Sequence, residues 1–238
     1  MATSTVENYL KQLYLEQNAA AGRKVSMGRL AIAMGVVPGT ATSMVKALSD
    51  SGLVEYEPRG GVRLTSRGQQ LALHVLRRHR LVELFLVKTL GLDWSEVHEE
   101  ADNLEHVISD RVLERMDALL GHPTADPHGD PIPTSKGQLH EPQRTSLADC
   151  AVGVGLQVAR VLDQEPEFLR FAEKQGCTGR IFEAAVKRAE VFAIGRLQGL
   201  TIEGEIRQSR LPCVIAHRTR PVADRELAFG VANFVRDG

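Results

Sequence analysis

The feature that most constrains the fold is a run of two short helices and a hairpin within residues 26–64. Ser26 suits the N-cap of the first helix, and Gly35 follows it in a turn. Pro38 suits the first turn of the second helix, which continues until Gly52. The segments LVEYEP and VRLTS, joined by the turn RGG, then predict two strands. Two such helices followed by a hairpin form a winged helix-turn-helix, which places its second helix in the major groove of DNA.

Further helices are expected over residues 4–18, 66–90 and 95–120. Ser4 suits the N-cap of the first, with Glu7 completing a capping box, and Gly91 ends the second. Four prolines and two glycines between residues 122 and 141 predict an extended linker or domain boundary. Beyond it, the runs VGVGLQVARVL, VKRAEVFAIG, LTIEGEI and CVIAH predict short strands, with a helix near PEFLRFAEKQ. The expected fold is therefore mainly α with a small β domain at the C-terminal side.

Charge is distributed unevenly along the chain. Residues 1–80 carry a net charge of +6, residues 81–150 a net charge of −9 and residues 151–238 a net charge of +2. A basic head attracts phosphate. An acidic middle can hold cations, or it can simply form a solvated face.

The cysteines and the hydropathy pattern indicate the compartment. The three cysteines are odd in number and far apart, which favours a reducing compartment over a disulfide scaffold. No apolar stretch approaches the roughly 18–20 residues that span a bilayer. The N-terminus also lacks the basic start and apolar run of a signal peptide. We therefore expect a cytoplasmic protein with no membrane partner.

Imidazole and carboxylate side chains gather on the helices of the acidic middle. On the helix expected over residues 95–120, four of them point within an arc of roughly 100°. These four are His98, Asp102, Glu105 and His106. His79 and Glu83 share a face of the preceding helix at i, i+4 spacing. Both ligand types suit divalent first-row metals, so two such helices side by side could hold one or two ions. The alternative is that these pairs form ordinary surface hydrogen bonds.

Other histidines and carboxylates are not expected to bind metal. Glu99 and Glu100 point away from the arc and are expected to be solvated. The linker histidines, which are His122, His128 and His140, are not expected to be ligands.

The N-terminal half of the second helix of the head is expected to read DNA, and the hairpin is expected to contact phosphates. The residues assigned to DNA are Ser26, Val37, Pro38, Gly39, Thr40, Thr42, Ser43 and Lys46, with Arg59 and Arg63 on the wing. None of them gives the arginine-to-guanine pairing that would identify a base, so the operator sequence is not predicted. The alternative is a winged helix that contacts only protein.

Several sequence blocks resemble the DtxR/MntR (diphtheria-toxin-repressor and manganese-transport-regulator) family of metal-dependent transcriptional repressors. They are TVENYLKQLY, VVPGTATSMVKAL, SGLVEYEPRGGVRLTSRG, RRHRLVELFL, VHEEADNLEHVIS and DPHGDPIPT. The resemblance covers about residues 4–134 well and the rest loosely. It implies a homodimer of three domains. These are a winged helix-turn-helix over residues 1–70, a helical dimerisation and metal-binding domain over 71–140, and an SH3-like domain over 141–238.

The resemblance also implies two metal sites per subunit. The ancillary site would comprise His79, Glu83 and His98, and the primary site Asn8, Asp102, Glu105 and His106. Asn8 stands where the iron branch has Met, and Asp102 stands where it has Cys. A glutamate of the manganese branch falls on Lys11, which cannot coordinate a metal while charged. Only oxygen and nitrogen donors remain, which favours Mn²⁺ or Fe²⁺. Further ligands from the SH3-like domain are expected near Asp163, Glu165 and Glu167.

The function expected from these features is that of a metal-activated repressor that binds double-stranded operator DNA and controls metal-ion homeostasis. A metal joining Asn8 to the middle helices would set the spacing of two recognition helices in a dimer. One alternative is a winged-helix regulator with purely structural acidic helices. The other is a metalloenzyme such as a hydrolase. Against the enzyme, the sequence has no HExxH helix, no glycine-rich phosphate loop and no nucleophile beside a base.

Overall fold

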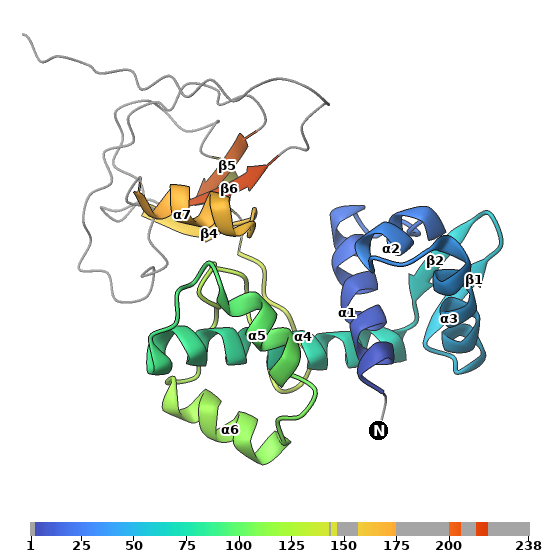
Figure 1. The fold of residues 1–238 in the computed structure, drawn as a ribbon, viewed down its shortest axis with the longest axis horizontal. Helices are drawn as coiled ribbons and strands as arrows, with labels where there is room; N and C mark the ends of the chain where they lie inside the picture. Colours follow the sequence, from blue (N-terminus) through green and yellow to red (C-terminus); the bar gives the residue numbers. More distant parts are fainter. Residues whose placement is uncertain (1–2, 143, 147–156, 175–199, 206–212, 219–238) are drawn as a thin grey trace, which may run out of the picture.

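A computed structural model of the chain describes residues 3–142, 144–146, 157–174, 200–205 and 213–218. The N-terminal head contains α1 (Ser4–Ala19), α2 (Met27–Ala33), α3 (Pro38–Asp50), β1 (Val54–Glu57) and β2 (Gly61–Leu64). β1 and β2 pair in antiparallel fashion, from Val54 opposite Leu64 to Glu57 opposite Gly61. The expected winged helix-turn-helix is therefore confirmed (Figure 1).

Local signals explain where the helices of the head begin. The Ser26 hydroxyl accepts a hydrogen bond from the backbone N–H of Arg29, and Pro38 opens α3. The prediction that Ser4 and Glu7 form a capping box at the start of α1 was wrong. Thr3, one residue earlier than Ser4, is the N-cap and accepts from the backbone N–H of Val6 at 3.4 Å. Glu7 then lies one position too far along the helix to close a box, and its carboxylate is used elsewhere.

The long helix α4 (Ser66–Leu90) connects the head to the rest of the molecule. Thr65 caps its start, and Gly91 ends it in the left-handed conformation at φ 73°. Gly68 lies where a Cβ would come within 2.0 Å of the Leu53 carbonyl oxygen, so only glycine allows the hairpin to approach so closely. Figure 1 shows α4 running from the head, past α1, into a group of helices that we call the helical middle.

The prediction of one long helix over residues 95–120 was wrong. Two shorter helices, α5 (Val97–Leu104) and α6 (Asp110–Leu119), replace it. Ser109 causes the break, because its hydroxyl accepts from the backbone N–H of Val112 and starts a new helix. Before α5, the Asp93 carboxylate accepts from both the backbone N–H and the hydroxyl of Ser95, which delays the helix start.

The proline-rich segment over residues 122–141 was expected to be an extended linker, but its central part is packed against the protein. Asp126, His128, Asp130 and Ile132 are buried. The Arg80 guanidinium donates to the Pro131 carbonyl at 2.5 Å, which ties the segment to α4. Prolines and glycines here shape an ordered loop, which we call the 126–132 loop.

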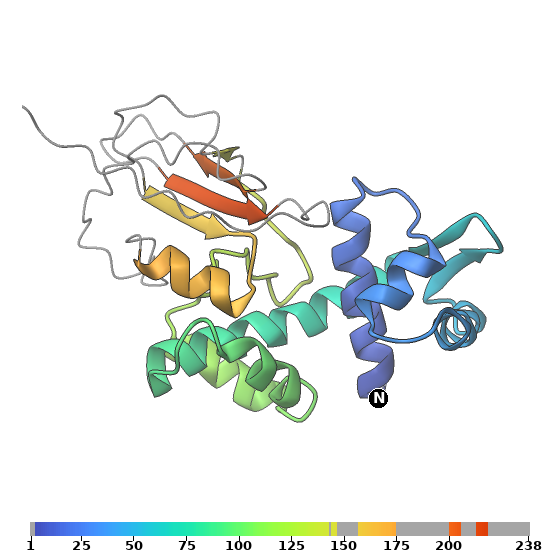
Figure 2. The same ribbon diagram turned by 45° about the horizontal axis from the view of Figure 1, so that its top comes forward.

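The C-terminal part contains β3 (Thr145–Ser146), β4 (Gln157–Val161), α7 (Pro166–Lys174), β5 (Leu200–Glu205) and β6 (Cys213–Arg218). The strands lie in the order β3-β5-β6-β4, and β4 pairs with β6 in parallel. The strands expected near QVARV, LTIEGE and CVIAH and the helix near PEFLRFAEK are confirmed, whereas VKRAEVFAIG lies outside the described residues. Figure 2 shows α7 between the sheet and the helical middle. The side chains of Leu169 and Ala172 on α7 pack with Trp94.

No single helix among the described residues is both long and apolar enough to cross a bilayer. Only α2 and α3 taken together reach that length and apolar composition, and they are bent by 104° at the break between them.

Candidate metal centre and DNA-binding head

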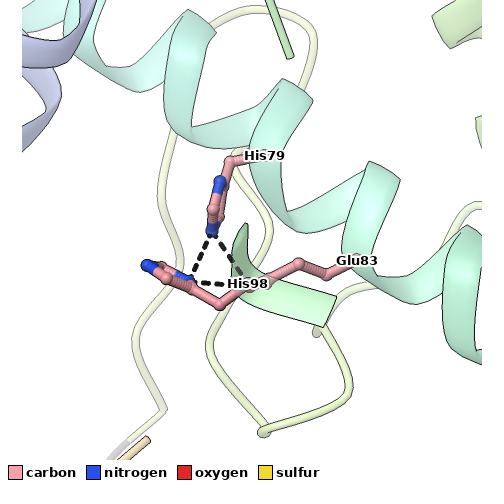
Figure 3. Close-up of side chains that lie close together, drawn as sticks. All are labelled: His79, Glu83 and His98. Carbon is pink, nitrogen blue, oxygen red and sulfur yellow. Dashed lines mark hydrogen bonds and ion pairs between the residues drawn. The ribbon is translucent and has the colours of Figure 1, made fainter. Parts of the chain in front are cut away.

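Glu83 lies at the centre of a group of imidazoles and carboxylates in the helical middle. His79 and Glu83 project from α4, and His98 comes from α5 to meet them (Figure 3). The Glu83 Oε1 atom lies 2.9 Å from His79 Nε2 and 3.1 Å from His98 Nδ1, and those two nitrogens are 3.1 Å apart. The structure thus brings together the three residues expected to form the ancillary site.

A deeper part of the same group involves two residues of the 126–132 loop. Glu83, Asp126 and His128 are all buried, and their ligand atoms lie within 4.8 Å of one another. We call His79, Glu83, His98, Asp126 and His128 together the Glu83 cluster. Asp126 and His128 were not predicted as ligands, because the prolines and glycines of their segment indicate an extended linker or domain boundary. The block DPHGDPIPT, in which two aspartates flank a histidine, does contain metal-type ligands at close spacing.

His128 presents a nitrogen suited to binding a ligand. Its Nε2 lies 2.8 Å from the Trp94 carbonyl oxygen, and because a carbonyl only accepts, Nε2 carries the proton. In the neutral ring, Nδ1 then has a free lone pair, and it lies 4.0 Å from Glu83 Oε2. Nδ1 is buried and has no hydrogen-bond partner among the described residues. A buried acceptor without a partner beside a carboxylate fits a site for a cation.

The charges of the Glu83 cluster shift its pKa values. Burial would lower the pKa of His79, but the charge of Glu83 and hydrogen bonds to Asp102, Glu105 and Glu83 raise it well above the usual range. Burial would raise the pKa of Glu83, but His79 and His98 hold it well below its usual range. Burial, followed by the charges of Asp130 and Glu83, raises the pKa of Asp126 to about 7.

The donor set of the Glu83 cluster therefore fits a divalent metal. It offers imidazole nitrogens and carboxylate oxygens without sulfur, which suits Mn²⁺, Fe²⁺ or Zn²⁺ better than soft ions. Burial and the charges of Asp130 and Glu83 raise the pKa of Asp126 although Arg80 Nε lies 3.6 Å from its Oδ2, so further positive charge would be favourable here. A divalent ion would supply that positive charge.

The residues expected to form the primary site also meet, between α1 and the helical middle, but a lysine lies among them. Lys11 Nζ is 2.7 Å from Asp102 Oδ1 and 2.7 Å from Glu105 Oε1. His106, just past the end of α5, has its Nε2 2.7 Å from Asn8 Oδ1 and its Nδ1 2.6 Å from Glu7 Oε2. We call this group the Lys11 cluster; it comprises Glu7, Asn8, Lys11, Asp102, Glu105 and His106.

Two corrections follow for the Lys11 cluster. Glu105 caps the C-terminus of α5 and His106 lies beyond it, so the four-residue arc on one helix was wrong for these two. They turn back toward α1 and α4 at the break before α6. Glu7, which the sequence pattern places in a capping box, contacts His106 instead.

The carboxylates suggested as extra ligands lie on the segment between β4 and α7 and at the start of α7. Asp163 is buried and accepts from the backbone N–H of Glu165, whereas Glu165 and Glu167 are exposed. Among the described residues three groups of potential ligands converge, and none includes these carboxylates: His79, Glu83 and His98; His79, Asp102 and Glu105; and Glu83, Asp126 and His128. Their role stays a prediction.

The head presents its expected DNA-binding residues on the surface. At the start of α3, Val37, Pro38, Gly39 and Thr40 are exposed, as are Ser43 and Lys46 further along. Thr42 is half-buried, and its hydroxyl donates to the Pro38 carbonyl. Ser26, also assigned to DNA, is exposed and acts as the cap of α2.

On the wing, Arg59 lies exposed in the hairpin turn at φ 66°. Arg63 is exposed and pairs with Glu55 on the neighbouring strand. Ile32 on α2, which the sequence reasoning did not consider, is 71% exposed, close to the 67% of Val37. Exposed apolar side chains therefore occur on α2 and at the start of α3.

A winged-helix head joined by a continuous helix to a cluster of metal-type ligands defines a DNA-binding protein with a metal-responsive centre. Two family models agree with that description. The model for the iron dependent repressor N-terminal DNA binding domain matches residues 1–62, and the model for the iron dependent repressor metal binding and dimerisation domain matches residues 65–134. The chain belongs to this family, the DtxR/MntR family of metal-dependent transcriptional repressors, whose members are repressors and not enzymes.

Curated relatives support the assignment. An uncharacterised HTH-type transcriptional regulator from Methanocaldococcus jannaschii is 38% identical over 121 residues, which cover 50% of this chain and 94% of the relative. The iron-dependent repressor IdeR of Mycobacterium tuberculosis is 37% identical over 130 residues, or 54% of this chain. This match spans only 55% of the length of IdeR.

Solved structures give the same result over more of the chain. A manganese-dependent transcriptional repressor in complex with manganese matches with a TM-score of 0.66 and 35% identity, over 90% of this chain and 94% of that one. ScaR with bound Zn²⁺ matches with a TM-score of 0.59 and 36% identity, over 73% of this chain and 80% of that one.

Proposed function

We propose that this chain is a repressor activated by Mn²⁺ or Fe²⁺, which it binds through the Glu83 cluster. The observation that carries the proposal is the buried lone pair of His128 Nδ1, which faces Glu83 beside His79 and His98. A bound ion would supply positive charge where His79 and Glu83 of α4, His98 of α5 and His128 of the 126–132 loop meet. The donors are all nitrogen and oxygen, which favours Mn²⁺ and Fe²⁺, and the relatives include manganese- and iron-dependent repressors.

The protein's own residues would connect metal binding to DNA binding. His79 and Glu83 lie on α4, the helix whose first turns pack against the hairpin through Gly68. Fixing this helix relative to α5 and the loop restrains the position of the head. With a metal held by the Glu83 cluster, α4 would keep the head in the position in which α3 enters the major groove of operator DNA and the wing arginines contact phosphates.

We propose that the chain acts as a homodimer. Val112 and Leu119 lie seven residues apart on α6 and so share one of its faces, and they are 49% and 68% exposed. Val107, in the turn before α6, is 75% exposed. An apolar face of this kind fits a second copy of the chain, in agreement with the dimerisation domain that the family model describes. A two-fold dimer would present two recognition helices to two half-sites.

We also propose that the chain is divided into three domains. The division into residues 1–70, 71–140 and 141–238 and the SH3-like nature of the third domain rest on the family resemblance. A contribution of Asp163, Glu165 or Glu167 to metal binding belongs to the same proposal, as does action in the cytoplasm, where operator DNA lies.

The test uses DNA retention with the full-length chain. DNA duplexes that bind the wild-type protein in the presence of Mn²⁺ would be selected from a random pool. The affinity of the protein for the best-binding duplex would then be measured with Mn²⁺ and with chelator. Glu83→Gln should abolish the Mn²⁺ response, because Glu83 is the carboxylate common to the group with His79 and His98 and the group with Asp126 and His128. Glu99→Gln, which changes an exposed carboxylate on α5, should leave the response intact. DNA affinity indifferent to chelator in the wild type would instead support a metal-independent regulator.

A further inference from the structure

The Lys11 ammonium lies between carboxylates that join the head to the helical middle. Its Nζ lies 2.7 Å from Asp102 Oδ1, 2.7 Å from Glu105 Oε1 and 2.9 Å from Glu105 Oε2. Lys11 is 8% exposed and Glu105 is fully buried. Asp102 and Glu105 lie 91 and 94 positions from Lys11 in the sequence. Their short contacts to the buried ammonium therefore form a tertiary interaction between α1 and the helical middle, and not a surface ion pair.

These contacts leave no position for a divalent ion between the two carboxylates. Asp102 and Glu105 direct their oxygens at Lys11 Nζ, which is where an ion bound to both would lie. A second cation within about 4 Å of the ammonium would be strongly repelled in a buried environment. The residues present therefore do not fit a metal here while Lys11 keeps its place, although the family resemblance predicts one.

We propose that Lys11 is an internal cation that replaces a metal ion between α1 and the helical middle. The head is then docked through α1 without metal, and the response to metal depends on the Glu83 cluster alone. This inference rests on the proposed function for the metal at the Glu83 cluster. It makes Lys11 the residue that determines how many ions the chain binds.

His79 connects the two clusters. On one side of its ring, Nε2 lies 2.9 Å from Glu83 Oε1; on the other, Nδ1 lies 2.8 Å from Glu105 Oε2 and 3.3 Å from Lys11 Nζ. Because Lys11 holds Glu105, it also positions His79, a member of the Glu83 cluster. Lys11 is therefore a positioning residue, and the link from α1 to the Glu83 cluster consists of the protein's own side chains.

The first test counts Mn²⁺ per full-length chain by equilibrium dialysis and elemental analysis. Lys11→Glu should bind one more ion per chain than the wild type, because it removes the internal cation and adds a carboxylate beside Asp102, Glu105 and His106. Lys11→Gln should show the same gain at higher Mn²⁺ concentration. Lys11→Arg, which keeps the charge, and Lys24→Met, which removes an exposed lysine paired with Glu57, should match the wild type.

The second test follows hydrogen exchange of α1 in chelator. In Lys11→Gln, the backbone amides of α1 should exchange about tenfold faster or more, since the docking contact is lost. Lys11→Arg should stay within about twofold of the wild type. Unchanged stoichiometry in both Lys11→Glu and Lys11→Gln, or unchanged exchange of α1 in Lys11→Gln, would overturn the proposal.

A double variant separates this inference from the proposed function. In Glu83→Gln with Lys11→Glu, the ion gained at the Lys11 position should remain while the binding of the wild-type protein is lost. If Glu83→Gln alone leaves the metal content unchanged, the proposed function fails, whatever Lys11→Glu does. If Glu83→Gln removes metal but neither Lys11→Glu nor Lys11→Gln adds an ion, only the internal-cation proposal fails.

Discussion

The Glu83 cluster and the Lys11 cluster are built from the same kinds of side chain, yet their chemistry differs. Both bring histidine and carboxylate groups from different parts of the chain to one point. In the Glu83 cluster the buried imidazole of His128 keeps a lone pair without a partner among the described residues. In the Lys11 cluster an ammonium already satisfies Asp102 and Glu105. Donor type and spacing therefore do not by themselves predict a metal site, because one lysine decides whether a group of potential ligands can accept a metal.

The largest effect should come from breaking the Lys11–Glu105 pair. Glu105→Gln should lower the free energy of unfolding in chelator by about 3 kcal/mol, because it leaves a buried ammonium with only Asp102 as a charged partner. Lys11→Met with Glu105→Gln should recover much of this loss, since no unpaired charge remains. Urea unfolding of the two single variants and the double variant measures the coupling. Simple additivity of the two losses would show that the pair is not coupled.

A second prediction contrasts two histidines, one from each cluster. His128→Ala should weaken Mn²⁺ binding by about 10- to 100-fold or more, since even partners outside the coordination shell are worth that much. His106→Ala should leave Mn²⁺ affinity within about twofold, because Glu7 and Asn8 hold this ring in the Lys11 cluster. Isothermal titration of both variants makes the comparison. Equal losses would place metal in the Lys11 cluster as well.

The pH dependence of stability provides a third test, centred on Asp126. Its folded-state pKa is raised from 3.8 to about 7, so between those values the folded protein binds more protons than the unfolded chain. The stabilisation this gives is fully present below pH 3.8 and is lost as the pH rises through about 7. The raised pKa of His79 acts in the same direction above its ordinary value of 6.5. The metal-free protein should therefore lose stability from pH 5.5 to 8.

Asp126→Asn isolates this effect. The variant should show a smaller fall in Tm across that range in chelator, with a difference of a few degrees at pH 8. It should also gain less stability from Mn²⁺ than the wild type, because a candidate ligand is lost. Thermal melts at several pH values with and without Mn²⁺ provide the measurement. Parallel pH curves for variant and wild type would mean that Asp126 does not titrate in this range.

The smallest effect should come from the cap of α1. Thr3→Ala should cost about 1 kcal/mol of stability, or about 2–4 °C in Tm, because the N–H of Val6 loses its acceptor. The first turns of α1 carry Asn8 and Glu7, so His106 should lose order while Mn²⁺ affinity stays unchanged. Ser4→Ala is the matched control, since Ser4 is not the cap. A loss of Mn²⁺ affinity in Thr3→Ala would mean that α1 contributes to the metal centre.

The head could be predicted from the sequence because its signals are local. Ser26, Pro38 and Gly52 each fix a helix end through contacts within a few residues, and the wing follows from two short strands and a turn. The pair His79 and Glu83 could be predicted for the same reason, since both lie on one continuous helix. Elements of this kind depend little on the rest of the fold.

The misplaced features depend on contacts between distant residues. Helical periodicity runs through residues 105–109, and only the Ser109 cap and the turn of Glu105 toward Lys11 interrupt it. The burial of His128 requires α4 and β4 on either side of the loop; the Val161 N–H donates to its carbonyl. The position of Lys11 depends on partners more than 90 residues away. No local pattern contains that information.

Anomalous diffraction at the manganese edge, from crystals grown with Mn²⁺, would locate the bound ion. We expect anomalous density within the Glu83 cluster, in contact with Glu83 and with imidazole nitrogens of His79, His98 or His128. We expect none between Asp102 and Glu105, where Lys11 Nζ should keep its contacts to both carboxylates. Density between Asp102 and Glu105 with Lys11 turned away, or an empty Glu83 cluster, would show that the metal does not bind as proposed.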